Sequence, residues 1–246
     1  MGAQYGRTDT QRCLQEIMPD IAATAKIGRG VVLGLENVVI DDYVWVEDGA
    51  VICSGTHIKS RTHIGAGARL GEYTPRNTDS ASAIVIGKSV DIGDGTVIGL
   101  GVKIGSKTKI GSSTRVDDYV RIGSQVVVGS GVQICRYAAM QSGVRIGDRA
   151  RLGMFCQISR NSDIGANANI EDCAKVGFGG DTGSKVGAWS ILRIGSKIEC
   201  GVVIGDNAVI DECCYIAHNI VIPNGKHISR DEVPETERKR PCNVSK

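Results

Sequence analysis

The sequence predicts an all-β fold, a parallel β-helix wound as a triangular prism, and three observations lead to this prediction. Aliphatic residues recur every six positions along most of the chain. The fourth residue after each aliphatic is small or β-branched, and the residue directly after it is often glycine. With 33 glycines and only 4% aromatic residues, the composition also favours many short extended segments joined by turns.

The longest uninterrupted run of this repeat contains sixteen aliphatic residues spaced six apart, from Ile86 to Val176. Within a unit, the small residue and the next aliphatic are two apart, so both point to the same side of a strand, which we expect to be the interior. Each unit therefore forms one short strand and one turn, and three units close one coil. We expect the glycine after the aliphatic, such as Gly87 or Gly105, to supply a positive φ at the turn.

The repeat continues on both sides of this run with small shifts in phase. Three units precede it between Ile21 and Leu33, and six lie between Ile40 and Leu70. Eight more units follow, from Val186 to Ile228. The total of 33 units predicts 11 coils. At about 4.8 Å per coil, the prism would be roughly 50 Å long.

This pattern predicts a single β-helix domain over residues 21–228, with two insertions. Residues 71–85 hold about ten residues more than the repeat needs, and residues 177–185 hold four more. Residues 1–20 are expected to form an N-terminal lead-in or cap. The charged tail, residues 229–246, contains two prolines and is expected to shield the open end of the helix.

Composition and charge exclude several classes of function. The 29 basic and 27 acidic residues are dispersed, which gives no reason to expect a nucleic-acid partner. The longest apolar runs are only a few residues long, so we expect no membrane insertion. The chain has no CxxC pair and no apolar signal segment after Met1, which indicates a cytoplasmic protein with reduced cysteines. Cys156 and Cys214 fall on inward positions and are expected to be core residues.

The hexads, of the form I-G-x-x-V-x over residues 21–228, resemble the left-handed parallel β-helix of the hexapeptide-repeat acyltransferases. Only the resemblance implies the left-handed winding, because the general rule for crossover connections favours right-handed ones. The resemblance also implies a homotrimer with active sites between neighbouring prisms. It further implies a thioester co-substrate, either acetyl-CoA or an acyl carrier protein that carries the acyl group.

Two segments carry a narrower resemblance. The stretch "CCYIAHNIVIPNG", residues 213–225, is similar to the segment of the lipid A pathway N-acyltransferases that carries the general base. The stretch "VGFGGDTG" is similar to a Gly-Phe-Gly loop that precedes that segment in the same family. The resemblance implies that His218 is the base, with Asn219 beside it. It places Phe178 and Asp181 of the loop near a nucleotide-linked sugar whose amino group is acylated.

Acyl transfer from a thioester needs a base for the acceptor's proton and donors for the developing oxyanion. A neutral imidazole suits the first role near pH 7. His218 follows an inward aliphatic by two, which places it on an outward corner that a neighbouring subunit would cover. Val176, Ile198 and Ile216 occupy equivalent positions in successive coils, so the second insertion lies on the same edge, roughly 10 Å away. The alternative is a solvated corner histidine without a catalytic role.

Supporting roles fall to a few further residues. Asp211 or Glu212 is a candidate to orient the His218 ring from the preceding face. Gly225, or another backbone amide of the last coils, is a candidate to bind the oxyanion or the pantetheine chain.

Basic residues of the tail are candidates to meet the phosphates of coenzyme A, with a solvated tail as the alternative. They are Arg238, Lys239 and Arg240.

A carbonic anhydrase built on this fold would need three zinc-binding histidines that converge between subunits. His57 and His63 are six apart and therefore face outward on different sides of the prism. His227 is the other candidate, and this set does not resemble a zinc site, so no metal is expected.

The sequence therefore predicts an acyltransferase that moves an acyl group, most simply acetyl from acetyl-CoA, to an amino group of a nucleotide-linked sugar. One alternative is an N-acyltransferase of the lipid A type that depends on acyl carrier protein. A second alternative is a structural or scaffolding β-helix without catalysis, because the fold alone does not establish an activity.

Overall fold

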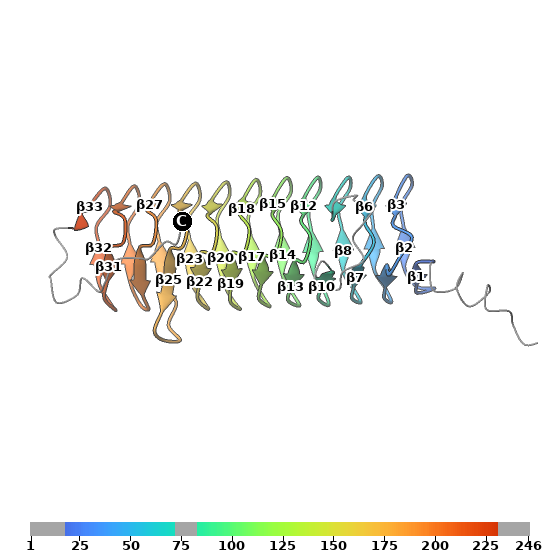
Figure 1. Cartoon of the computed structure of the whole chain (residues 1–246), viewed down its shortest axis with the longest axis horizontal. Helices are drawn as coiled ribbons and strands as arrows, with labels where there is room; N and C mark the ends of the chain where they lie inside the picture. Colours follow the sequence, from blue (N-terminus) through green and yellow to red (C-terminus); the bar gives the residue numbers. More distant parts are fainter. Residues whose placement is uncertain (1–17, 72–82, 231–246) are drawn as a thin grey trace, which may run out of the picture.

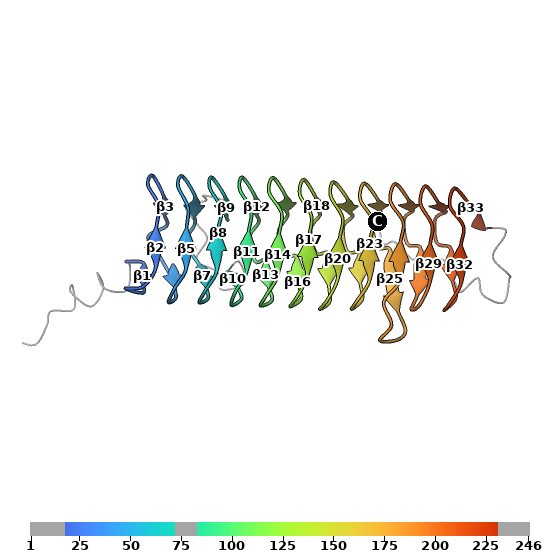
Figure 2. The same cartoon turned by 180° about the vertical axis from the view of Figure 1, so that it is seen from behind.

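A computed structural model of the chain describes residues 18–71 and 83–230, which form one solenoid of short parallel strands (Figure 1, Figure 2). Three consecutive strands complete one coil, and each strand pairs with the strand three places further along the chain. The result is a prism with three faces, named sheets A, B and C, each of which contains 11 strands.

Sheet A carries the strands that depart most from the two-residue norm, and the second insertion leaves from it. In order, its strands are β1 (Asp20–Ile21), β4 (Val39–Ile40), β7 (Thr56–Ile58), β10 (Ile84–Ile86), β13 (Lys103–Ile104), β16 (Arg121–Ile122), β19 (Ala139–Met140), β22 (Gln157–Ile158), β25 (Lys175–Phe178), β28 (Lys197–Glu199) and β31 (Tyr215–Ile216). The four-residue strand β25 runs past its inward aliphatic, Val176, into the insertion.

Sheet B consists entirely of two-residue strands. They are β2 (Lys26–Ile27), β5 (Trp45–Val46), β8 (His63–Ile64), β11 (Asp91–Ile92), β14 (Lys109–Ile110), β17 (Val127–Val128), β20 (Arg145–Ile146), β23 (Asp163–Ile164), β26 (Lys185–Val186), β29 (Val203–Ile204) and β32 (Val221–Ile222).

Sheet C is equally regular and ends the described helix. Its strands are β3 (Val32–Leu33), β6 (Val51–Ile52), β9 (Arg69–Leu70), β12 (Val97–Ile98), β15 (Arg115–Val116), β18 (Gln133–Ile134), β21 (Arg151–Leu152), β24 (Asn169–Ile170), β27 (Ile191–Leu192), β30 (Val209–Ile210) and β33 (His227–Ile228).

The predicted lattice is confirmed strand by strand. The 33 predicted units correspond to the 33 strands, and the aliphatic residue of each unit lies in its strand. Ile104, Ile122 and Met140 are direct partners in the parallel ladder of sheet A, so these side chains stack one above another. The three-sided parallel solenoid agrees with the left-handed β-helix that the resemblance implied.

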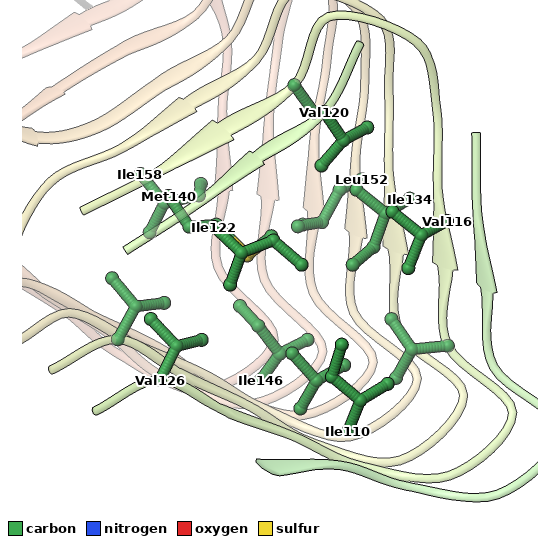
Figure 3. Close-up of a cluster of buried hydrophobic side chains, with 14 of the residues drawn as sticks. Ile110, Val116, Val120, Ile122, Val126, Ile134, Met140, Ile146, Leu152 and Ile158 are labelled. Atoms are coloured by element: carbon green, nitrogen blue, oxygen red, sulfur yellow. The ribbon is translucent and has the colours of Figure 1, made fainter. Parts of the chain in front are cut away.

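The interior is a column of buried aliphatic side chains drawn from all three sheets, as Figure 3 shows for the middle coils. Burial of each such side chain contributes about 1.5–3 kcal/mol. Threonines at the small inward positions keep their hydroxyls bonded: those of Thr96 and Thr108 each donate to a backbone oxygen at 2.9 Å, on Gly111 and Gly123 respectively. The core therefore holds polar atoms without leaving these hydroxyls unpaired.

The positive φ expected at the glycines that follow the aliphatics is wrong for most of them, although Gly71 and Gly177, where the insertions begin, do have it. Gly87 and Gly105 do not have a positive φ, which occurs two residues later, for example at Lys107 (φ 60°). The N–H of Lys107 donates to the carbonyl of Lys88 in the preceding coil at 2.9 Å, a bond that helps to hold this conformation. At Gly87 an added Cβ would lie 2.7 Å from the backbone nitrogen of Ser106. Glycine is needed at this position because adjacent coils approach too closely for a side chain.

Both insertions occur where the repeat predicted extra residues. The first follows β9 and precedes β10, and its residues 72–82 lie outside the described chain, as do residues 1–17 and 231–246. The proposed cap and tail therefore fall largely outside it, including Arg238 and Lys239. The second insertion follows β25 and projects from the row of coils (Figure 1).

The structure also bears on the predictions for the cysteines and for a membrane-spanning segment. Cys156 and Cys214 are buried, as predicted, and burial raises the pKa of their thiols to about 12 and about 11. None of the described segments forms a helix with the length and apolar character that a membrane crossing requires.

Candidate active site

His218 lies in the last described coil, at the corner between sheets A and B. It follows β31 by two residues, and its side chain is 68% exposed. The next residue, Asn219, has a φ of 60°, and its N–H donates to the carbonyl of Cys200 in the preceding coil at 3.2 Å. This bond helps to fix the corner, so the histidine projects outward from a defined backbone.

Glu199, the last residue of β28, is the carboxylate next to His218. Its Oε2 accepts a hydrogen bond from the His218 backbone N–H at 3.0 Å and lies 3.2 Å from Nδ1 of the ring. Its Oε1 accepts a hydrogen bond from the Tyr215 hydroxyl. Only 20% of the Glu199 side chain is exposed. One carboxylate thus holds both the backbone and the ring of the histidine.

These contacts determine the charge of the carboxylate and the tautomer of the ring. The Tyr215 hydroxyl is the largest influence and lowers the pKa of Glu199, and the contacts with His218 lower it further against the opposing effect of burial. An ionised carboxylate can only accept hydrogen bonds, so Nδ1 of His218 must carry the proton in this contact. In the neutral ring, the lone pair then lies on Nε2, on the opposite edge of the imidazole.

An aromatic pair forms a wall beside this group. The ring centroids of Phe178 and Tyr215 are 6.2 Å apart, with the planes tilted by 59°. Phe178 reaches this place because β25 continues past Val176, with a shift in register that pairs Phe178 with Glu199. The candidate site is therefore assembled from three successive coils of sheet A.

The second insertion packs closely against the coil that precedes His218, at Cys200. Gly177 and Gly179 have φ angles of 75° and 89°, which glycine adopts without strain. The N–H of Cys200 donates to the carbonyl of Phe178 at 2.9 Å. At Gly180 a Cβ would lie 2.7 Å from Sγ of Cys200, so only a residue without a side chain fits there as the backbone stands.

The structure brings together only some of the predicted site residues. Phe178 contacts Tyr215 within the site, and Asn219 adjoins His218 in the chain, with its side-chain oxygen close to Gly201. Asp181, in the insertion, has a side chain that is 92% exposed and contacts Arg160 at 3.5 Å. This contact is with Arg160 and not with Glu199, Tyr215 or His218.

Two predicted residues have other roles. Oδ1 of Asp211 lies 2.9 Å from Nε2 of His227, so Asp211 supports that histidine on sheet C and Glu199 takes the place expected of it beside His218. Gly225 lies at the corner between sheets B and C, and its N–H donates to the carbonyl of Asp206 at 2.7 Å. That amide is therefore already hydrogen-bonded within the chain.

Glu199 and Tyr215 are the residues that sequence reasoning missed. The signal was present in the repeat: Glu199 precedes Cys200, which lies 18 residues before His218, and 18 residues make one coil. A shift of one coil toward the N-terminus places Glu199 at the same corner as His218.

Metal binding finds no support among residues 18–71 and 83–230, where no group of three or more His, Cys, Asp or Glu side chains is arranged to hold an ion. The other histidines contact carboxylates instead. Nε2 of His57 lies 2.9 Å from Asp41, and His63 lies between Glu47 and Asp91. As predicted, His57 and His63 face outward on different sheets.

No protein-family model and no curated protein matches this sequence. Solved structures with a similar chain path include a UDP-N-acetylglucosamine acyltransferase of Bacteroides fragilis, with 20% identity and a TM-score of 0.40 over 73% of this chain and 65% of that one. The enzyme of the same name from Campylobacter jejuni shows 15% identity and a TM-score of 0.43, over 84% of this chain and 70% of that one.

A third similar structure is a UDP-N-acetylglucosamine O-acyltransferase of Moraxella catarrhalis, with 18% identity and a TM-score of 0.41 over 77% of this chain and 70% of that one. This chain thus spans a little under two thirds of the Bacteroides protein. Identities and TM-scores this low establish no shared activity, and the assignment of the fold rests on the strand order and register.

Proposed function

We propose that this protein is an acyltransferase that moves an acyl group, most simply acetyl, from a thioester donor to the amino group of a nucleotide-linked sugar. The observation that carries the proposal is the contact between His218 and an ionised Glu199 on an exposed corner. The resemblance of residues 213–225 to a base-carrying segment supports the same assignment.

His218 would act as general base at Nε2. The acceptor's amine attacks the thioester carbonyl carbon, a C–N bond forms, and Nε2 takes a proton from the nitrogen. The tetrahedral intermediate then collapses, the C–S bond breaks, and the imidazolium returns the proton to the departing thiolate. The products are an amide and a free thiol, and no covalent enzyme intermediate forms.

Glu199 would stabilise the imidazolium that exists between these two proton transfers, because its negative charge faces Nδ1. Tyr215 would act as a positioning residue, since its hydroxyl holds Glu199 from the other oxygen. The Phe178–Tyr215 wall would offer an apolar surface beside the reacting groups.

We further propose a homotrimer in which a neighbouring prism covers the corner of His218. Support comes from the exposure of this region: the side chains of Ile220 and Val221, which follow His218, are 41% and 69% exposed despite being apolar. Acetyl-CoA is the proposed donor, acyl carrier protein is the alternative, and the proposed location is the cytoplasm.

The test is a screen of nucleotide-linked amino sugars with acetyl-CoA and with acyl carrier protein loaded with longer chains, read as a mass increase of the sugar. With an active pair in hand, His218→Gln should lower kcat by about 100-fold or more. His227→Gln is the matched control, because His227 also contacts a carboxylate in the last coil but lies on sheet C.

Equal activity of His218→Gln and the unmodified protein would overturn the assignment of the base. Absence of transfer from every donor to every acceptor would favour the non-catalytic scaffold.

A further inference from the structure

A hollow with its own arrangement of charge lies on the outer face of sheet C, away from the corner of His218. Its volume is about 440 Å³, and it spans the coils that contain β9, β12 and β15 and reaches Arg136, which follows β18. The residues that give it its chemical character are Arg69, Val97, Arg115, Asp117, Asp118 and Arg136.

Two arginines flank an apolar floor in this hollow. Val97 is the direct ladder partner of Arg69 on one side and of Arg115 on the other. Neighbouring strands are about 4.8 Å apart, so the backbones of the two arginines are about 10 Å apart with Val97 between them. A small molecule lying over Val97 would have a guanidinium group on each side.

Two of the three guanidinium groups form ion pairs with aspartates of the hollow. Nε of Arg115 donates to Oδ1 of Asp117 at 2.8 Å, and Nη2 of Arg136 lies 3.1 Å from Oδ2 of Asp118. Oδ1 of Asp118 also accepts the N–H of Leu100 at 2.9 Å. The aspartate side chains are only 27% and 23% exposed, whereas the arginines are 70% and 61% exposed. A ligand therefore meets the cations before it meets the carboxylates.

Arg69 brings a third guanidinium group to the hollow. No ion pair or hydrogen bond joins its side chain to another residue of the described chain. Among the described lining residues, three arginines and two aspartates carry the charge. Hydrogen bonds between a guanidinium group and an anion with several acceptor oxygens are stronger than those between neutral groups.

We propose that this hollow binds a small organic phosphate monoester, with the phosphate on the guanidinium groups and the organic part over Val97. A phosphate monoester has three terminal oxygens and a larger negative charge than a carboxylate, so it can accept hydrogen bonds from more than one arginine at once. The volume lies within the range of small-molecule sites. This site is separate from the proposed acyl transfer and does not depend on it.

The test is a calorimetric titration of the full chain with phenyl phosphate. We expect saturable binding with one site per chain, weaker binding of inorganic phosphate, and no binding of benzyl alcohol, which lacks the anion. Arg69→Gln should weaken phenyl phosphate binding by about tenfold or more, since it removes a charged hydrogen-bond donor. Arg69→Lys, which keeps the charge but not the planar fork, should give an intermediate loss.

Arg151→Gln is the matched control, because Arg151 projects from β21 on the same sheet, two strands beyond β15. It should bind phenyl phosphate within about twofold of the unmodified protein. Absence of saturable binding, or unchanged binding by Arg69→Gln, would overturn the proposal. So would an equal loss in Arg151→Gln, which would indicate general attraction to a basic face. His218→Gln should bind phenyl phosphate normally, which separates this test from that of acyl transfer.

Discussion

His63 and His218 both project from the outside of the prism toward carboxylates, yet the two histidines are held differently. His63 lies on sheet B, where Nδ1 is 2.9 Å from Asp91 and Nε2 is 2.9 Å from Glu47. At His218 the described side-chain contact is the one between Nδ1 and Glu199. The side chain of His63 is 33% exposed and that of His218 is 68% exposed.

The number of carboxylates in contact with the ring separates His63 from His218. A neutral imidazole has one N–H, and two carboxylates both require a donor, so His63 satisfies both only as an imidazolium. Burial alone would lower the pKa of His63, but the hydrogen bonds to Asp91 and Glu47 outweigh it and raise the pKa. His63 thereby links its own coil to the coils of Glu47 and Asp91. His218 donates one N–H to its single carboxylate, so the lone pair of Nε2 stays available to accept a proton.

The largest effect is expected when the carboxylate of His218 loses its charge. Glu199→Gln removes the group that fixes the tautomer and stabilises the imidazolium, so kcat for acyl transfer should fall by about 100-fold with little change in KM. Steady-state kinetics on the pair identified by the screen measures this. Asp211→Asn is the control, since it makes the same change beside His227, and it should leave kcat unaltered. A smaller loss in Glu199→Gln than in Asp211→Asn would contradict the assignment.

A smaller effect is expected from Tyr215, whose hydroxyl donates to Glu199. Tyr215→Phe removes one hydrogen bond and keeps the ring against Phe178, so kcat should fall by about fivefold. Because the hydroxyl lowers the pKa of Glu199, its removal lets that pKa rise, and the acid side of the kcat profile should move to higher pH. Tyr137→Phe, in the stacked pair of Tyr119 and Tyr137, is the control. An unchanged pH profile in Tyr215→Phe would argue against a positioning role.

The lattice was predictable because burial dictates it. When an aliphatic residue recurs every six positions, burial is greatest in the arrangement where every one of them faces a shared interior. Stacking of the coils then places Ile104, Ile122 and Met140 in register. The same logic located both insertions. It also placed His57 and His63 on different faces, since neighbouring strands belong to different sheets.

The candidate site was only partly predictable, because it depends on contacts between coils. The segment around His218 identifies the histidine and makes Asp211 on the preceding face a candidate partner, but the ring contacts Glu199 of the preceding coil instead. Glu199 is 19 residues away, and the 18-residue coil places it near the same corner, but its contact with the ring depends on the side-chain geometry of that corner. The glycine error has the same origin, since close approach between coils explains Gly87 better than the φ of its own turn.

The smallest effect is expected at His63 and is a pH dependence of stability. The folded pKa of His63 is raised above its unfolded value of about 6.5, so its contribution is fully present below that pH and is lost as pH rises through the folded pKa. His63→Gln should therefore lower the free energy of unfolding by about 0.5–1 kcal/mol at pH 5.5 and by less at pH 8.5. Urea unfolding midpoints of the two proteins at both pH values measure this difference.

Removing the two carboxylates instead of the ring provides the reciprocal experiment. Glu47→Gln combined with Asp91→Asn leaves His63 without either negative charge, so its pKa should return toward the usual value and the same pH-dependent part of stability should disappear. Gln133→Ala, an uncharged outward change on sheet C, should shift the midpoint equally at both pH values. A stability loss in His63→Gln that grows with pH would mean that the ring is neutral in the folded protein. The contrast between His63 and His218 would then have to be explained by exposure alone.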